Sequence, residues 1–480
     1  MTFLLCLACT TLAWDEPPKA AAPAPAAIDV VSALEKTLAD AIARAEPSVV
    51  AIHRDKADNA QETLAVRGKT RRPRQVGPGG ITRARPLGEE NDQISFDFGS
   101  GVVVGDEGQI LTAFHVVKGA RGLIVRATDR QVFEAEVIAA DPRSDLAVIA
   151  PISTPGLEKP KLKPIPLGDA GALRKGSFLV VLGNPFNAAR DGKASASWGI
   201  LSNVSRRIDQ DIDDVSFTRR APPQLPNYPT LLQLDAKLNL GMSGGAVVNM
   251  KGELVGLTTM ASSPAGFDAM AGYAIPMDRM GRRAVETLKQ GKEIEYGLLG
   301  VRPHLQSTNR VETVAPNSPA ALGDLQRNDE IIGVNGTPVF DFDSLILAIG
   351  AYSVGDSIRL LVRRDGQEIE KPIVLAKFPV DGEVIATTQP PAWRGLRVDY
   401  LSTLNARPAG IELLDALPAG VVVREIEPDS PAARAGLKKW QIIRQVGDQP
   451  VVDPAQFAKA VADLNGPVTL LTDQGPIVVR

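Results

Sequence analysis

The chain contains few cysteine, histidine and aromatic residues for its length. Its 480 residues include two cysteines, three histidines and 5% aromatic side chains. Both cysteines, Cys6 and Cys9, lie among the first ten residues, so disulfides cannot cross-link the rest of the chain. No group of His, Cys, Asp and Glu has metal-site spacing, and the sequence has no G-x-x-x-x-G-K-[ST] phosphate loop. We therefore expect no metal, no ATP and no other cofactor.

The sequence also lacks a charge excess and a long hydrophobic run. The formal net charge is −3, which gives no general attraction to nucleic acid. No apolar stretch approaches the roughly 20 residues that a membrane-spanning helix needs. Hydrophobic residues make up 44% and charged residues 23%, as in soluble globular proteins. At about 150 residues per domain, the length favours three domains.

The first 27 residues have the composition of a leader followed by a tether. The stretch 1–13, MTFLLCLACTTLA, is apolar and ends in Thr-Leu-Ala, a signal-peptidase pattern. Lipid attachment at Cys9 is the alternative way of processing this stretch. Residues 14–27 are rich in Pro and Ala, which is typical of a tether. A periplasmic or secreted protein would carry such a start, with a membrane anchor on Cys9 as the alternative.

The folded part begins with a predicted helix over 28–46, where Val31, Leu34, Leu38 and Ile42 follow helical spacing. The segment 67–85 carries seven basic residues and no acidic one, so we expect a solvated surface loop, with an anionic partner as the alternative. Between residues 96 and 276, short apolar runs alternate with glycine turns. That pattern predicts an all-β sandwich or barrel.

An internal repeat occupies the C-terminal part of the chain. The stretch 315–339, APNSPAALGDLQRNDEIIGVNGTPV, aligns without gaps to 427–451, EPDSPAARAGLKKWQIIRQVGDQPV. Pro316 and Pro428 are 112 residues apart, as are Pro338 and Pro450. Because a solenoid period is much shorter, this spacing indicates a duplicated domain.

The stretch 239–249, NLGMSGGAVVN, fits the G-x-S-x-G pattern of a reactive serine, although an inert glycine turn is the simpler alternative. A nucleophilic Ser243 needs a base and an orienting acid. His115 lies in ILTAFHVVKGA and Asp145 in DPRSDLAVI, whereas His53 and His304 are expected to be structural or exposed. The chain order His, Asp, Ser is that of chymotrypsin-like proteases and differs from the Ser, Asp, His order of α/β-hydrolases.

These motifs resemble the HtrA/Deg family of envelope serine proteases. The resemblance extends to GNPF (183–186), GILSN (199–203), LQLDAKLN (232–239) and GYAIP (272–276), and the two repeats resemble PDZ domains. It implies a mainly β fold with a chymotrypsin-like double β-barrel and two α+β PDZ domains. The implied order is a protease domain over 28–290, PDZ domains over 295–379 and 393–480, and a linker over 380–392.

The resemblance implies a role for each matched residue. Ser243 would attack the scissile carbonyl, His115 would move its proton, and Asp145 would hold the imidazole. The oxyanion hole would lie along Gly241, Met242 and Ser243, with the amides of Gly241 and Ser243 as donors. Because the family usually has Asn where this chain has Met242, the order of this loop is a question for the structure. Lys237 stands where trypsin has its acidic specificity residue, so cleavage after Lys or Arg is not expected.

The PDZ resemblance implies peptide binding by strand addition, with the peptide carboxylate held on backbone amides. The matching loops are assigned to Leu298, Leu299, Gly300 and Val301 in the first copy and to Gly395, Leu396, Arg397 and Val398 in the second. This alignment puts Arg397 where the first copy has Gly300. Packing without a ligand is the alternative for either copy.

Taken together, the sequence predicts an ATP-independent serine endopeptidase of the cell envelope that degrades unfolded or damaged proteins. Its expected partners are unfolded chains, peptide C-termini and further copies of itself, since the family forms trimers or multiples of trimers. A catalytically silent PDZ-bearing scaffold or chaperone is the alternative function.

Overall fold

The structure is a computed structural model that describes residues 27–56, 98–153, 158–184, 191–206, 230–262, 271–304, 308–316, 318–380, 383–406 and 419–480. The expected signal peptide, the tether up to residue 26 and the basic segment 67–85 lie outside the described residues. In the described part of the chain, no helix has the length and apolarity required to cross a membrane.

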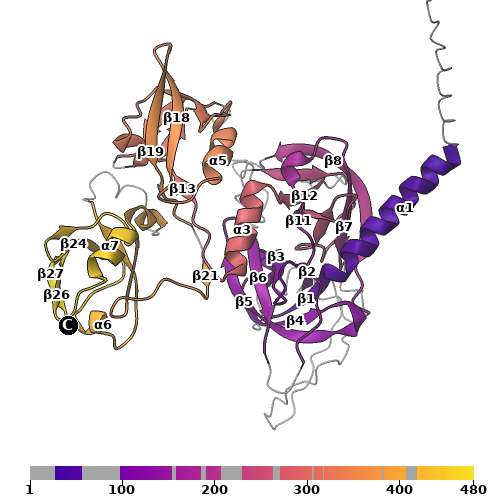
Figure 1. The fold of residues 1–480 in the computed structure, drawn as a ribbon, viewed down its shortest axis with the longest axis horizontal. Coiled ribbons are helices and arrows are strands. Elements are labelled where there is room, and N and C mark those ends of the chain that lie inside the picture. The colour runs from indigo at the N-terminus through magenta and orange to yellow at the C-terminus, as the bar shows by residue number, and fades with distance from the viewer. Residues whose placement is uncertain are drawn as a thin grey trace, which may run out of the picture.

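The predicted β-rich region forms two barrels, which confirms the expected double-barrel fold (Figure 1). In the first barrel the strands follow the order β5-β4-β1-β2-β3-β6, and pairing of β5 with β6 closes it. Its strands are β1 (Val49–Lys56), β2 (Phe98–Val103), β3 (Ile110–Ala113), β4 (Ala120–Arg126), β5 (Val132–Asp141) and β6 (Leu146–Pro151).

The second barrel closes in the order β10-β11-β12-β9-β8-β7. Its strands are β7 (Phe178–Gly183), β8 (Ser195–Arg206), β9 (Leu231–Leu234), β10 (Ala246–Val248), β11 (Leu254–Ser262) and β12 (Ala271–Pro276). Closing a sheet on itself removes its unpaired edges, so a barrel can use strands as short as β10.

Two helices flank the barrels. Helix α1 (Ala27–Ala45) covers most of the predicted helical segment and contacts β7, while α3 (Arg279–Lys289) packs against β5 and β6 (Figure 1). Asp278 caps α3 by accepting the N–H of Gly281 at 2.9 Å. The apolar face of α3 joins the main core through Ala284, Val285 and Leu288. Helix α3 thus fixes the point at which the chain leaves the barrels.

Two similar C-terminal modules follow. The first contains β13 (Gly297–Leu298), β14 (Val301–Pro303), β15 (Val311–Val314), α4 (Pro319–Leu322), β16 (Glu330–Val334), β17 (Thr337–Pro338), α5 (Phe342–Gly350), β18 (Ser357–Arg364), β19 (Gln367–Val374) and β20 (Ala376–Lys377). The second contains β22 (Leu396–Tyr400), β23 (Val421–Ile426), α6 (Pro431–Arg434), β24 (Ile442–Val446), β25 (Gln449–Pro450), α7 (Pro454–Val461), β26 (Val468–Thr472) and β27 (Gly475–Val479). Each module has its own apolar core.

The expected linker 380–392 does more than join the two modules. Its strand β21 (Ile385–Ala386) pairs antiparallel with β5, so that Ile385 lies opposite Ala140 and Ala386 opposite Ala139 (Figure 1). The N–H of Thr387 continues the ladder to the carbonyl of Ile138 at 3.1 Å. The connection between the modules is therefore also part of the first barrel's sheet.

A buried ion-pair cluster ties the two connections together. The ammonium of Lys377, 3% exposed, lies 3.0 Å from Glu293 and 3.0 Å from Asp399, and Arg424 bonds both carboxylates. Burial alone would lower the pKa of Lys377, but the charges of Asp399, Glu293 and Glu295 outweigh burial and raise it. The cluster joins residues from before the first module, from its end and from the second module.

Candidate active site

Strand pairing brings the predicted base and acid together. His115 lies in α2 (Phe114–Val117), a single helical turn that directly follows β3. Asp145 lies in the turn between β5 and β6. Strands β3 and β6 pair with Ala113 opposite Leu146. The residue after Ala113 and the residue before Leu146 therefore lie side by side; these are Phe114 and Asp145. The N–H of Phe114 donates to the carbonyl of Asp145 at 2.9 Å, which fixes the two backbones.

The side chains of His115 and Asp145 form a two-point contact. Nδ1 of His115 lies 2.8 Å from Oδ2 and 3.0 Å from Oδ1 of Asp145, and the His115 N–H donates to Oδ1 at 2.9 Å. Asp145 is only 5% exposed. A buried carboxylate held this way fixes the orientation of the imidazole and favours the proton on Nδ1. Nε2 is then the atom that can accept a proton from a nucleophile.

This environment shifts the titration of His115. Burial alone would lower its pKa, but the charge and hydrogen bond of Asp145 outweigh burial and the opposing charge of Arg54, so the pKa is raised. Arg54 holds the helical turn by donating to the carbonyls of His115 and Lys118. A base with a raised pKa is a stronger proton acceptor, but it is already protonated at a higher pH.

Thr259, on β11, completes the arrangement and was not predicted from the sequence. Its hydroxyl donates to Oδ2 of Asp145 at 2.7 Å, and its carbonyl accepts the hydroxyl of Ser243 at 2.7 Å. Thr259 is therefore hydrogen-bonded to both Ser243 and Asp145. Within the described part of the chain, no hydrogen bond joins Ser243 to His115. The Ser243 side chain must rotate to reach His115, and such bonds are often loose before substrate binds.

Replacing Thr259 by valine removes one hydroxyl donor to Asp145 and keeps the branched shape. A hydrogen bond to a buried charge contributes about 1.5–3 kcal/mol, so we expect kcat/KM for peptide cleavage to fall about tenfold or more. Thr313→Val, at an exposed strand position of the first module, is the matched control. Equal rates for both variants would contradict a role for Thr259 in holding the acid.

The loop that carries Ser243 requires its glycines. Gly241 has φ +94° and Gly244 has φ +82°, a region that residues with a Cβ rarely enter. A Cβ on Gly241 would overlap the ring of Phe98, and one on Gly244 would overlap the carbonyl of Ser100. The N–H groups of Gly241 and Ser243 donate to no acceptor in the regions that the structure describes. Both amides are therefore available to an oxyanion.

Side chains from both barrels brace this loop. The Ser100 hydroxyl, on β2, donates to the carbonyl of Gly241 at 2.8 Å and accepts the N–H of Asn184 at 2.8 Å. The Thr258 hydroxyl donates to the carbonyl of Met242 and accepts the N–H of Gly245. Since these contacts come from β2 of the first barrel and β11 of the second, the tertiary fold holds the loop in place.

Met242 has a bracing role that the sequence did not suggest. Its side chain is 3% exposed within the core of the second barrel, and its sulfur accepts the N–H of Asn239 at 3.4 Å. Its own N–H donates to the carbonyl of Asn239 at 3.1 Å. The Met242 amide is therefore already bonded, whereas those of Gly241 and Ser243 are open within the described residues. The buried thioether thus supports the loop from within the core of the second barrel.

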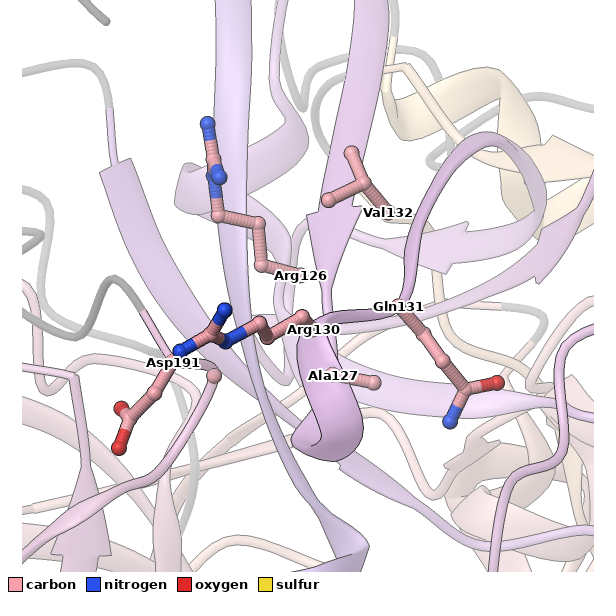
Figure 2. A pocket seen from close by; sticks show the side chains of 7 residues that line it. Arg126, Ala127, Arg130, Gln131, Val132 and Asp191 are labelled. Carbon is pink, nitrogen blue, oxygen red and sulfur yellow. The ribbon is translucent and has the colours of Figure 1, made fainter. Parts of the chain in front are cut away.

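The remaining predicted residues lie away from this cluster. His304 faces Glu312 at 3.1 Å in the first module, and His53 lies in β1 opposite Phe98. Lys237 is exposed, and its carbonyl accepts the hydroxyl of Ser197. A separate cavity of about 440 Å³ is lined by Arg126, Ala127, Arg130, Gln131, Val132, Asp191 and Gly192 (Figure 2). It lies at the β4–β5 hairpin and contains no residue of the cluster around Ser243.

The structure corrects the alignment of the two predicted carboxylate-binding loops. In the first module the carbonyls of Leu299 and Gly300 accept the N–H groups of Ala320 and Ala315. In the second module the carbonyls of Arg394 and Gly395 accept the equivalent N–H groups of Ala432 and Glu427. Both glycines have positive φ, +85° and +79°, and each packs against a serine, Ser318 or Ser430.

Gly395, and not Arg397, is therefore the counterpart of Gly300. The N–H groups of Leu299 and Gly300 donate to no acceptor in the described stretches, and neither do those of their counterparts Arg394 and Gly395. Arg397 forms ion pairs with Glu425 and Glu427 at 3.3 and 3.1 Å. The two loops thus present the same pair of open backbone donors.

Comparison with family models divides the chain into three matching regions. Residues 99–257 match the trypsin-like peptidase domain, which spans the positions of His115, Asp145 and Ser243. Residues 297–374 and 422–473 match PDZ domains. The peptidase match and the two PDZ matches follow one another in the order that the sequence predicted.

Comparison with curated proteins finds several similar bacterial endoproteases. The periplasmic serine endoprotease DegP of Salmonella typhimurium is 32% identical over 376 residues, which cover 75% of this chain and 71% of the relative. DegP of Escherichia coli K12 is 31% identical, with 76% and 71% covered. Among solved structures, the HtrA-type protease AlgW with a decapeptide has a TM-score of 0.50 and 24% identity, over 71% of this chain and 98% of that one. This last likeness concerns the fold.

Proposed function

Because the chain belongs to the HtrA/Deg family of serine proteases, we propose that His115, Asp145 and Ser243 are the catalytic triad with which it hydrolyses peptide bonds. The chain is a serine-type endopeptidase with two PDZ domains. The observation that supports this triad most strongly is the double contact of His115 with the buried Asp145, beside a serine in a glycine-braced loop.

Each residue has one step in the reaction. Ser243 attacks the scissile carbonyl while Nε2 of His115 takes its proton, and the same proton then goes to the leaving amine. Asp145 holds the imidazole and stabilises its charged form. The N–H groups of Gly241 and Ser243 stabilise the oxyanion of the tetrahedral intermediate, each donor contributing about 10²–10³ in kcat. A water molecule then hydrolyses the acyl-enzyme by the same route.

The proposed substrates are unfolded or damaged proteins. The support is the family, since the similar DegP proteins are serine endoproteases of the periplasm, together with PDZ domains that capture extended chains. We expect reduced, carboxymethylated lysozyme to be degraded and native lysozyme to be left intact under the same conditions, measured by gel electrophoresis. Equal cleavage of the native form, or a single cut in either form, would contradict a quality-control role.

Mass spectrometry of the same digests tests the cleavage preference. Lys237 stands six positions before the serine and offers no negative charge to a basic side chain. We propose cleavage after small aliphatic residues, as the family resemblance suggests. A digest dominated by cuts after Arg or Lys would contradict this preference.

The first PDZ domain is proposed to hold a peptide C-terminus at its Leu298–Val301 loop, where the Leu299 and Gly300 amides are open. In the second domain the corresponding loop is Trp393–Leu396, where the Arg394 and Gly395 amides donate to no acceptor in the described residues. Calorimetric titration compares the affinity for a peptide with a free C-terminal carboxylate with the affinity for the same peptide carrying a C-terminal amide. Weaker binding of the amide form is the expected result. Equal affinities would exclude a carboxylate site.

The location is the periplasm or cell envelope, as for the similar DegP proteins. The finer proposals are export through residues 1–13, lipid attachment at Cys9, and assembly into trimers or multiples of trimers. They rest on the sequence motif and the family. Palmitate labelling with Cys9→Ser as control tests the anchor, and light scattering of the purified chain tests the assembly; an unlabelled parent or a monomer would overturn the respective proposal.

A further inference from the structure

The turn that carries Asp145 is shaped by a second buried carboxylate, Asp141. Oδ2 of Asp141 accepts the Ser144 N–H at 2.9 Å and the Ser144 hydroxyl at 2.5 Å. Asp145 itself has φ +56°, a left-handed conformation that is unfavourable for a residue with a Cβ. Such a conformation persists only where surrounding contacts hold it. The position of Asp145 therefore depends on the bonds made at Asp141.

The third donor to Asp141 comes from outside the barrels. The hydroxyl of Tyr296 donates to the same oxygen, Oδ2. Tyr296 is 3% exposed and lies between α3 and β13, in the connection to the first PDZ domain. Burial raises the pKa of Tyr296 well above its usual value, so the hydroxyl stays protonated and remains a donor. The connection between α3 and the first PDZ domain is thus linked to the turn of Asp145 through the Tyr296–Asp141 hydrogen bond.

Two further contacts place both connectors on the same short stretch of chain. The guanidinium of Arg143 lies over the rings of Tyr296 and Phe378, with its Cζ 4.5 and 3.6 Å from the ring centroids. Phe378 directly follows the last strand of the first PDZ domain, and its N–H donates to the Tyr296 carbonyl at 2.7 Å. Strand β21, from between the PDZ domains, pairs with Ala139 and Ala140. The PDZ connectors therefore contact the chain directly before Asp145.

We propose that Tyr296 is a positioning residue for the triad: its hydroxyl, by holding Asp141, keeps the turn 141–145 in the shape that presents Asp145 to His115. The proposal rests on the proposed catalytic role of this triad. The Tyr296–Asp141 hydrogen bond links the connection to the first PDZ domain with Asp145. A shift of that domain that moves Tyr296 therefore changes how firmly Asp145 holds the imidazole of His115. Movement of Tyr296 would thus change the strength of the hydrogen bond between Asp145 and His115.

The test compares Tyr296→Phe with Tyr400→Phe, which removes a hydroxyl that has no hydrogen-bond partner in the described structure. We expect Tyr296→Phe to lower kcat about tenfold with KM unchanged, the effect of one lost hydrogen bond to a charged group. The acidic limb of the pH profile should also move to lower pH, because a looser Asp145 raises the pKa of His115 less. A purely structural role would lower the melting temperature and leave this limb in place.

A second readout does not depend on activity. With Ser243→Ala as background, ¹⁵N-labelled histidine allows His115 to be titrated by NMR, since the chain has only three histidines. We expect the pKa of His115 to fall in Tyr296→Phe and to stay unchanged in Tyr400→Phe. An unchanged pKa in a folded Tyr296→Phe protein would overturn the proposal, even if the enzyme is active. If the unmodified chain did not cleave an unfolded protein at all, that result would instead contradict the proposed function.

A third variant covers the case in which Tyr296→Phe does not fold. Asp141→Asn keeps the side-chain shape and weakens the same contact by removing the acceptor's charge. It should lower the pKa of His115, as Tyr296→Phe does. The effects of the two variants on kcat should not fully add, because both weaken the Tyr296–Asp141 hydrogen bond, while Asp141→Asn also weakens the bonds from Ser144. Fully additive effects, or no shift of His115 in Asp141→Asn, would overturn the proposal.

Discussion

Replacing Ser243 by alanine is expected to lower kcat for cleavage of an unfolded protein about a millionfold, which a standard assay would register as complete loss. The nucleophile, base and acid act together, so removal of the serine alone removes covalent catalysis. The fold should persist, because the Ser243 hydroxyl makes one hydrogen bond, to the Thr259 carbonyl, and a single neutral bond contributes about 1 kcal/mol.

Ser202→Ala is the matched control, since Ser202 lies on β8 of the same barrel and outside the cluster. Degradation of casein followed over hours, with circular dichroism of each variant, separates lost chemistry from lost structure. If Ser243→Ala were folded and still cleaved at the parent rate, another residue would be the nucleophile and the triad assignment would be wrong.

Replacing Asp145 by asparagine is expected to lower kcat about 10⁴-fold, as loss of the orienting acid does in enzymes with this arrangement. The amide can donate to Nδ1, which favours the tautomer with the proton on Nε2, and that tautomer cannot accept the serine proton. The pH at which the acidic limb of the kcat/KM profile falls should change as well. In the parent, activity is lost as pH falls through the raised pKa of His115, above the usual value of about 6.5.

In Asp145→Asn the charge that raises the pKa of His115 is gone, while burial, which lowers it, remains. The acidic limb of kcat/KM should therefore move to lower pH, with the residual rate measured by a fluorogenic peptide. Asp106→Asn, at an exposed position of the first barrel, should leave both rate and limb unchanged. A limb that stays in place, or a fall in rate of less than tenfold, would show that Asp145 does not orient the base.

Part of the fold followed from the sequence because the signals were local or ordered. Alternating apolar runs between residues 96 and 276 predicted β structure, and the order His115, Asp145, Ser243 favoured the double barrel. The constant spacing of 112 residues indicated a duplicated domain, which two PDZ matches confirm. Each of these features can be seen without knowledge of which strands pair.

Residues whose role depends on strand register could not be predicted. Thr259 comes 16 positions after the serine and carries no motif, so only the pairing of β11 within the barrel places it beside Asp145. Tyr296 carries no motif either, and it falls inside the predicted first PDZ domain (295–379), so nothing in the sequence links it to the active site. The stretch 380–392 has the composition of a linker, yet β21 within it pairs with β5 because an edge was free at Ala139 and Ala140.

The misaligned PDZ loop has a different cause. Ser318 and Ser430 keep the 112-residue spacing, but Gly300 and Gly395 are only 95 apart, because the second copy has more residues between its glycine and its serine. An ungapped repeat cannot show such a change in length outside the aligned stretch. The contact of each glycine with its serine identified the true counterparts.

Labelling with a fluorophosphonate tests directly whether Ser243 is an activated nucleophile, because this probe phosphonylates a serine only where a base activates it. We expect one equivalent of probe per chain, located at Ser243 by mass spectrometry, with no adduct in His115→Ala. A folded chain that takes no label at Ser243, or takes it elsewhere, would contradict the triad assignment and favour a binding protein on a protease-like scaffold.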